Sequence, residues 1–133
     1  MKDSQHTTIL LIRHGQTDWN LARRAQGHID IPLNEAGRRQ SARLARRLAG
    51  WPVDAIYSSD LRRASETATI LGRALNLTPR LDVAFRDRNG GAFQGLTGDE
   101  LARLYPEAVQ AFLEQGRTPP GGESNLDLAR RAT

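Results

Sequence analysis

Short apolar segments alternate with amphipathic helical segments along this chain, and that alternation restricts the folds it can adopt. Residues 7–12 (TTILLI) form an apolar, β-branched run without alternation, which is typical of a buried strand. Residues 53–57 and 79–84 predict two more strands, and an amphipathic helix is expected after each of the first two strands. This order predicts an α/β fold with three layers, α/β/α, around a mostly parallel sheet.

The sequence also marks where the two helices begin and which faces they bury. Asn34 suits the N-cap of the first helix, and Gly50 with Pro52 ends it. The turn at residues 58–60 can cap the second helix. Small or apolar residues then share one face of each helix: Gly37, Ser41, Leu44, Ala45 and Leu48 in the first, and Leu61, Ala64, Ala68, Leu71 and Leu75 in the second.

The second half of the chain predicts loops and shorter helices. Residues 86–95 are rich in glycine, and residues 99–113 read as a helix with a break at Pro106. Ser124, with Asp127 three residues later, resembles a capping box, so a last helix has barely begun at Thr133. We therefore expect one domain over residues 1–133 that is incomplete at its C-terminus.

Reactive side chains follow the first two predicted strands. Residues 13–20 read RHGQTDWN, and residues 58–64 read SSDLRRA. Parallel strands bring their carboxyl ends to one edge of a sheet, which is where open α/β sheets place their sites. His14 is therefore expected near Arg13 and near either Arg62 or Arg63.

This combination of residues suits phosphoryl transfer. A neutral imidazole can attack phosphorus and form a covalent intermediate. Fixed donors lower the barrier because negative charge spreads over the oxygens of the transferring group, and the arginines, Asn20 and the Gly15 amide can supply such donors. This chemistry predicts neither a metal nor a cofactor. A histidine after a strand is often an ordinary loop residue, so the prediction depends on the wider set of motifs.

Five motifs in order resemble one family over nearly the whole chain. Residues 11–20 (LIRHGQTDWN) are similar to the signature of the histidine phosphatase superfamily, also called the phosphoglycerate mutase-like family. The similarity continues through QGHIDIPLNEAG at residues 26–37, SSDLRRASETA at 58–68, GAFQGL at 91–96 and GGES at 121–124.

The resemblance implies a role for each matched position. His14 is the residue that becomes phosphorylated, and Arg13 belongs to the phosphate pocket. The second pocket arginine of the family directly precedes an alanine, which selects Arg63 over Arg62. Further matched positions belong to the phosphate pocket (Gly15 and Asn20) or line the substrate site (Thr17, Gln26 and Gly27).

Asp87 departs from the family pattern. It stands where the family usually has a glutamate that acts as general acid, and it is one methylene shorter. A proton donor must come within hydrogen-bond reach of the leaving oxygen, which a backbone adjustment or a bridging water would restore. The other interpretation is a loop carboxylate paired with Arg86 or Arg88, and both stay open.

A second departure is the absence of the family's later histidine. That histidine belongs to a Ser-His-Gly motif on a strand between the strand before His14 and the one ending near Tyr57. His6 is expected to be solvated and His28 to lie on the surface or at the pocket rim. We expect a chain truncated before this motif, whose strands pair with each other or with a second copy, or leave the domain poorly folded.

Composition excludes several classes of function. The absence of cysteine rules out thiol catalysis and argues against structural zinc. The net charge of +4 comes mostly from arginines spread over helices, and aromatic residues are few, which argues against nucleic-acid binding. The longest apolar run is too short for a membrane span, and the polar segment Met1–Thr8 is unlike a signal peptide, so a cytoplasmic location is expected.

Two functions remain. The first is a phosphatase that acts on a small phosphomonoester through phosphorylated His14, with a mutase as its nearest variant. The family's glycolytic mutases carry a long insertion between the third motif and the Glu-Ser turn, and only residues 97–122 separate these here, which favours a phosphatase. The alternative is a truncated, non-catalytic chain that at most binds anions or self-associates as a homodimer.

Overall fold

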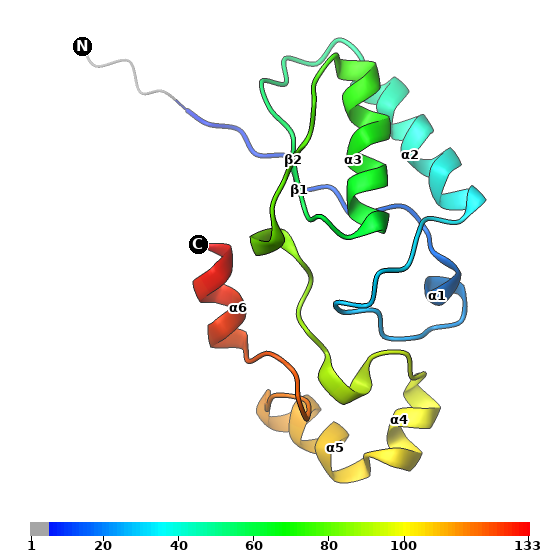
Figure 1. The fold of residues 1–133 in the computed structure, drawn as a ribbon, viewed down its shortest axis with the longest axis vertical. Coiled ribbons are helices and arrows are strands. Elements are labelled where there is room, and N and C mark those ends of the chain that lie inside the picture. Colours follow the sequence, from blue (N-terminus) through cyan, green and yellow to red (C-terminus); the bar gives the residue numbers. More distant parts are fainter. Residues whose placement is uncertain (1–5) are drawn as a thin grey trace.

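The computed structural model describes residues 6–133, and helices dominate it (Figure 1). The polar segment expected at Met1–Thr8 therefore lies mostly outside the described residues. Within residues 6–133, no helix is long and apolar enough to cross a membrane. The first half of the chain forms a β–α–β unit next to one further helix: α2 (Glu35–Leu48), β1 (Tyr57–Ser58), α3 (Arg62–Leu75) and β2 (Arg80–Leu81).

The strands β1 and β2 pair in parallel, joined by α3. Tyr57 lies opposite Arg80 and Ser58 opposite Leu81, and the Arg80 amide donates to the Ile56 carbonyl at 2.8 Å. This unit confirms the predicted α/β class and its parallel pairing. The sheet is incomplete, because it contains two short strands within residues 6–133.

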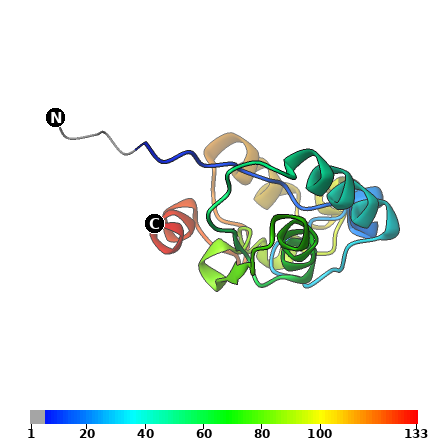
Figure 2. The same cartoon turned by 90° about the horizontal axis from the view of Figure 1, so that it is seen from above.

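The prediction of a buried strand at residues 7–12 is wrong for this structure. The segment runs extended and unpaired away from the helices (Figures 1 and 2), and the exposed fractions of Ile9 and Leu11 are 75% and 94%. A strand needs a neighbour for its main-chain polar groups. The resemblance places a later strand beside this segment, and the 133 residues contain no Ser-His-Gly motif to supply it.

The first long helix, α2, begins as the sequence predicted. The Asn34 side chain accepts a hydrogen bond from the Gly37 amide at 2.9 Å, which satisfies one free donor of the first turn. For α3 the predicted cap is corrected. Leu61 occupies the N-cap, while the Asp60 carboxylate is bound by Arg86 at 2.7 and 2.5 Å.

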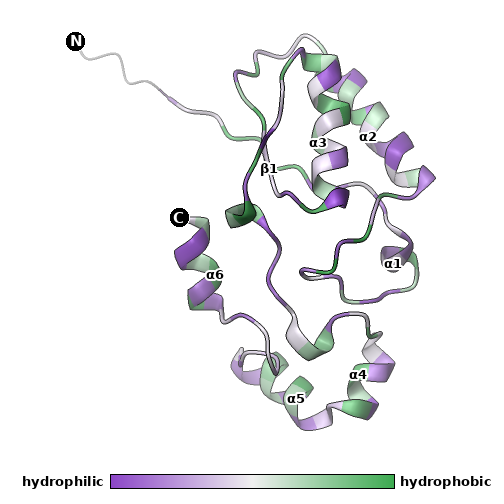
Figure 3. Cartoon of the chain, in the orientation of Figure 1, coloured by the Kyte–Doolittle hydropathy of each residue, from purple (hydrophilic) through white to green (hydrophobic). Residues whose placement is uncertain are grey.

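The core lies between α2 and α3, which pack side by side (Figures 1 and 2). Figure 3 shows the apolar and polar stripes of both helices. Burying the apolar stripes provides the main stabilisation. The buried centre and the half-buried residues around it are Ala45, Leu48 and Leu71, with Leu44, Ile56, Ile70 and Leu75.

A second group of helices follows the sheet. The predicted break at Pro106 is confirmed, because Pro106 starts a new helix after a kink at Tyr105. Phe93 packs against Tyr105 and Phe112 with ring centroids 6.1 and 5.9 Å apart, and the Arg88 guanidinium lies 5.1 Å above the Phe112 ring. The elements outside the β–α–β unit are α1 (Asp18–Leu21), the 3₁₀ turns η1 (Val83–Phe85) and η2 (Gly91–Phe93), α4 (Gly98–Leu104), α5 (Pro106–Gln115) and α6 (Asn125–Ala132).

The start of α2 touches the loop that carries His14. A Cβ on Gly15 would lie 2.5 Å from the Gly37 carbonyl oxygen, and a Cβ on Gly37 would overlap the main chain of Gln16. Two glycines therefore let this loop approach the helix without any side chain between them.

We predict that Gly37→Ala lowers the free energy of unfolding by about 1 to 3 kcal/mol, as overpacked sites do. A loss of stability would be informative, because alanine is otherwise favoured over glycine inside a helix. Gly98→Ala, in the first turn of α4 where an added Cβ meets open space, should change stability by less than about 0.5 kcal/mol. Urea unfolding measures both, and equal effects would contradict the close approach.

Candidate active site

His14 follows the extended N-terminal segment and is half-buried. Its Nδ1 lies 2.7 Å from the Gly15 carbonyl oxygen. Because a carbonyl can only accept, this contact places the proton of the neutral imidazole on Nδ1 and leaves the lone pair on Nε2. The ring is thus oriented with Nε2 as its free nucleophilic atom.

The loop after His14 is attached to α3 through a residue that the sequence analysis did not select. The Gly15 amide donates to the Thr67 hydroxyl at 3.1 Å, and that hydroxyl donates to the Arg63 carbonyl at 2.8 Å. The Gly15 amide, predicted as a phosphate donor, is therefore engaged with α3 in this structure. The signal for Thr67 was its position one helical turn after Arg63, on the same face.

Arg63, and not Arg62, lies beside His14. Its side chain is only 2% exposed, and it donates to the carbonyls of Ile29 and Gly27 at 2.9 and 2.7 Å. Burial lowers the pKa of its guanidinium, which still stays charged because an arginine does not deprotonate in proteins. Arg62 is exposed, and its amide donates to Asp30 at 2.6 Å.

Thr17 is fully buried, and its side chain bonds within its own loop. Its exposed fraction is 0%, and its hydroxyl lies 3.0 Å from Asn20 Oδ1 and 2.8 Å from Gln26 Oε1. The Asn20 side chain also accepts from the Thr17 amide, which completes a capping box at α1. The amide oxygens of Asn20 and Gln26 are thus bound within the loop, and the amino groups at their other ends are the atoms suited to donate to a phosphate.

Gly27 acts through its main chain. Its φ of +51° suits glycine, and a Cβ there would overlap the side chain of Gln94. Its carbonyl accepts a hydrogen bond from Arg63, so Gly27 lies beside the buried guanidinium. His28 follows at the rim, where its Nε2 lies 2.8 Å from the Asp87 carbonyl oxygen.

Asp87 lies at the same site, with its carboxylate largely in solvent. The side chain is 64% exposed, and its Oδ2 is 3.8 Å from Arg63 Nη2. Pairing with Arg86 is not observed, because Arg86 binds Asp60, and Arg88 contacts the Asp87 carboxylate through its amide at 2.7 Å. The structure therefore places an accessible carboxyl group beside the histidine–arginine pair.

The electrostatics of the cluster favour a neutral His14. Burial lowers the pKa of the imidazole most, and the charges of Arg63 and Arg13 lower it further. The hydrogen bond that the ring donates to the Gly15 carbonyl and the charge of Asp87 act in the opposite direction. A neutral ring in the field of two guanidinium groups is suited to attack an electrophile that carries negative oxygens.

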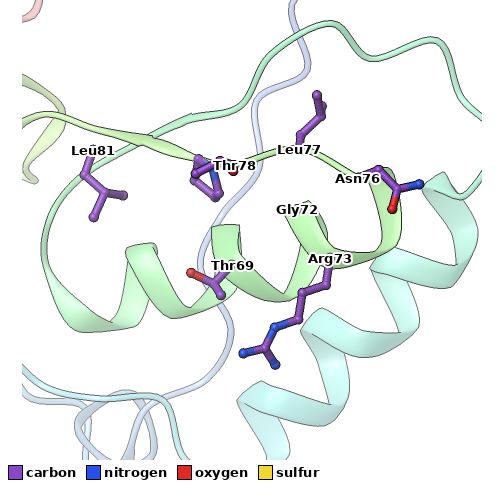
Figure 4. Close-up of a pocket in the computed structure, with 8 residues that line it drawn as sticks. Thr69, Gly72, Arg73, Asn76, Leu77, Thr78 and Leu81 are labelled. Atoms are coloured by element: carbon purple, nitrogen blue, oxygen red, sulfur yellow. The ribbon is translucent and has the colours of Figure 1, made fainter.

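No group of three or more potential metal ligands occurs among residues 6–133. A surface hollow lies along α3, away from the residues discussed above (Figure 4). It contains one arginine and no histidine or carboxylate, so its side chains offer no nucleophile or acid for phosphoryl transfer. Its lining is Thr69, Gly72, Arg73, Asn76, Leu77, Thr78, Pro79 and Leu81.

Comparison with known proteins agrees with this geometry. The model of the histidine phosphatase superfamily (branch 1) matches residues 9–133. The chain is 42% identical over 138 residues to phosphoglycerate mutase-like protein 4 of Arabidopsis thaliana, covering 99% of this chain and 60% of that protein. It is 41% identical over 125 residues to glucosyl-3-phosphoglycerate phosphatase of Mycobacterium tuberculosis, covering 93% of this chain and 56% of that protein.

Solved structures give the same result. The mycobacterial glucosyl-3-phosphoglycerate phosphatase in complex with VO3 superposes with a TM-score of 0.83 at 42% identity, over 90% of this chain and 57% of that one. The chain therefore belongs to the histidine phosphatase superfamily, and its α/β fold is the fold of that family. It spans a little over half the length of the relatives that it matches.

We predict that the His14 imidazole titrates below its ordinary pKa of about 6.5. Arg13→Gln should raise the midpoint, because one repelling charge is removed, whereas Arg43→Gln on the exposed face of α2 should leave it unchanged. The folded state disfavours the protonated ring, so the free energy of unfolding should decrease as the pH falls below about 6.5, the ordinary pKa. The decrease should end once the pH lies below the pKa of His14 in the folded protein. NMR of the ring protons measures the midpoint, and an unshifted or raised value would contradict the burial.

Proposed function

We propose that His14 is the nucleophile of a phosphatase that acts on a small phosphomonoester. The observation that carries the proposal is the orientation of the half-buried His14 ring, with Nδ1 bound to the Gly15 carbonyl and Nε2 left over, where burial and the charges of Arg63 and Arg13 lower its pKa. The chain covers a little over half the length of its relatives, so their activity is extended to it only as a proposal.

The reaction follows from the placement of these groups. Nε2 of His14 attacks phosphorus in line with the leaving oxygen, and the Nδ1–H bond to Gly15 stabilises the charge that develops on the ring. Arg13 and Arg63 balance the charge on the phosphoryl oxygens. Asp87, in its protonated form, gives its proton to the leaving oxygen. A water then attacks the phosphohistidine, loses its proton to Asp87, and releases phosphate.

The relatives support the class of substrate. Their names include a metal-independent phosphoserine phosphatase of Arabidopsis thaliana, a mycobacterial glucosyl-3-phosphoglycerate phosphatase and probable phosphoglycerate mutases of Yersinia. Each name specifies a small phosphorylated molecule, and the short connection at residues 97–122 favours a phosphatase over a mutase. Homodimerisation and a cytoplasmic location stay predictions.

The alternative, a chain that at most binds anions or self-associates, is favoured by one observation. The apolar residues 9–12 are exposed and the sheet around them is incomplete. The cluster of His14, Arg63 and Asp87 is nevertheless assembled without a neighbour for that segment. The first experiment therefore asks whether the assembled cluster reacts.

We predict that the chain, mixed with a ³²P-labelled phosphomonoester and quenched in alkali, carries acid-labile phosphate on His14. His14→Ala should abolish both the label and any turnover, and His6→Ala, which removes an exposed histidine, should change neither. Turnover that survives in His14→Ala would contradict the mechanism. Absence of label on the wild-type chain would favour the anion-binding alternative for these 133 residues.

We predict that Asp87→Asn slows hydrolysis of alkyl phosphates by about 100-fold or more, the usual contribution of a general acid. Aryl phosphates with good leaving groups, such as p-nitrophenyl phosphate, need less protonation and should lose much less. The ratio of kcat/KM for the two substrates measures the effect. Equal losses on both would remove Asp87 from the role of acid and return it to that of a loop carboxylate.

A further inference from the structure

Arg131 joins three parts of the chain that are distant in the sequence. From α6 it binds the Glu123 carboxylate through Nε at 2.6 Å and Nη2 at 2.9 Å. The same guanidinium donates to the Ala84 carbonyl at 2.7 Å and to the Asp87 carbonyl at 2.8 Å. All three of its nitrogens are therefore in use, and two of its contacts fix the main chain that carries Asp87.

These contacts of the Arg131 guanidinium are called the Arg131 clamp here. Glu123 keeps its charge in this clamp at neutral pH. Its side chain is 14% exposed, and the bond from Arg131, together with the Asn89 amide, lowers its pKa to about 2. A carboxylate that stays charged keeps the Arg131 guanidinium in one orientation, since paired charge-assisted bonds fix geometry as well as energy. The Glu123 amide also donates to the Asn89 carbonyl at 2.9 Å, so the segment from Ala84 to Asn89 is held along its length.

His28 makes a second contact with the Asp87 carbonyl. His28 Nε2 lies 2.8 Å from the Asp87 carbonyl oxygen, and His28 belongs to the loop whose neighbouring carbonyls bind Arg63. The Asp87 carbonyl therefore receives two side chains, one from α6 and one from the Arg63 loop. The carboxyl group itself is 64% exposed, and its contacts are the adjacent Arg88 amide at 2.7 Å and Arg63 Nη2 at 3.8 Å.

We propose that Arg131 and His28 are positioning residues that set the reach of the Asp87 carboxyl group toward the leaving oxygen. The inference rests on the proposed function and assigns it two residues outside the phosphate pocket. Aspartate has one rotatable bond fewer than glutamate and a shorter reach, so changing its rotamer compensates less for a displaced main chain. The placement of the proton donor then depends on the main chain at residue 87, and Arg131 fixes that main chain.

Lysine cannot replace Arg131 in this position. The clamp needs donors that diverge toward a carboxylate and two carbonyls at once, which the planar fork of arginine supplies and a single ammonium group does not. Arg130, the preceding residue, is exposed and carries the same charge. It therefore offers a matched control for the loss of a guanidinium group in α6.

The test compares kcat/KM for an alkyl phosphate and for p-nitrophenyl phosphate in the wild-type chain, Arg131→Lys, Arg130→Lys and His28→Ala, and in Arg131→Lys and His28→Ala each combined with Asp87→Asn. We expect Arg131→Lys to lose about tenfold or more on the alkyl phosphate, part of the general-acid contribution, and less than about threefold on the aryl one. His28→Ala should show the same selectivity, and Arg130→Lys none. In the Asp87→Asn background, Arg131→Lys should cause no further loss.

Equal losses on both substrates, or a full further loss in the Asp87→Asn background, would overturn the positioning role and leave the proposed function standing. If Arg131→Lys does not fold, His28→Ala decides by the same two criteria, because His28 contacts the Asp87 carbonyl and the change leaves the Arg131–Glu123 pair in place. A wild-type chain that turns over neither substrate overturns the proposed function and this inference with it. The two failures are therefore distinguishable.

Discussion

The buried guanidinium of Arg63 is the interaction on which the rest of the site depends. It is 2% exposed, yet it carries a charge, and the carbonyls of Gly27 and Ile29 compensate for the water it has lost. Those bonds hold the loop at residues 27–29 against α3. Burial lowers the pKa of the half-buried His14 most, and the charge of Arg63 lowers it further.

The side chains around Arg63 act in two groups. One group supplies the reacting atoms of the proposed mechanism: the His14 ring with its Nε2, and the Asp87 carboxyl group 3.8 Å from the guanidinium. The other group holds main chain, as Thr67 does for the His14 loop and Arg131 does for residue 87. Most of the second group lies in helices, so rigid elements hold the loops that carry the proposed site.

The sequence predicted the parts of this structure that depend on local chemistry. The cap at Asn34, the buried faces of the two long helices and the break at Pro106 follow from propensity and spacing, and all are confirmed. The strand at residues 7–12 failed because a strand forms only with a neighbour, which local sequence does not reveal. The full burial of Thr17 was not predictable for a similar reason, since burial of a polar side chain depends on tertiary contacts.

The most direct measurement of the central claim, attack by His14 followed by attack of water, is the stereochemistry at phosphorus. A phosphomonoester made chiral with oxygen isotopes and sulfur would be hydrolysed by the protein in isotopically labelled water. Two in-line displacements, with phosphohistidine between them, predict net retention of configuration. Net inversion would mean that water attacks the substrate directly, and it would contradict the assignment of His14 as the nucleophile.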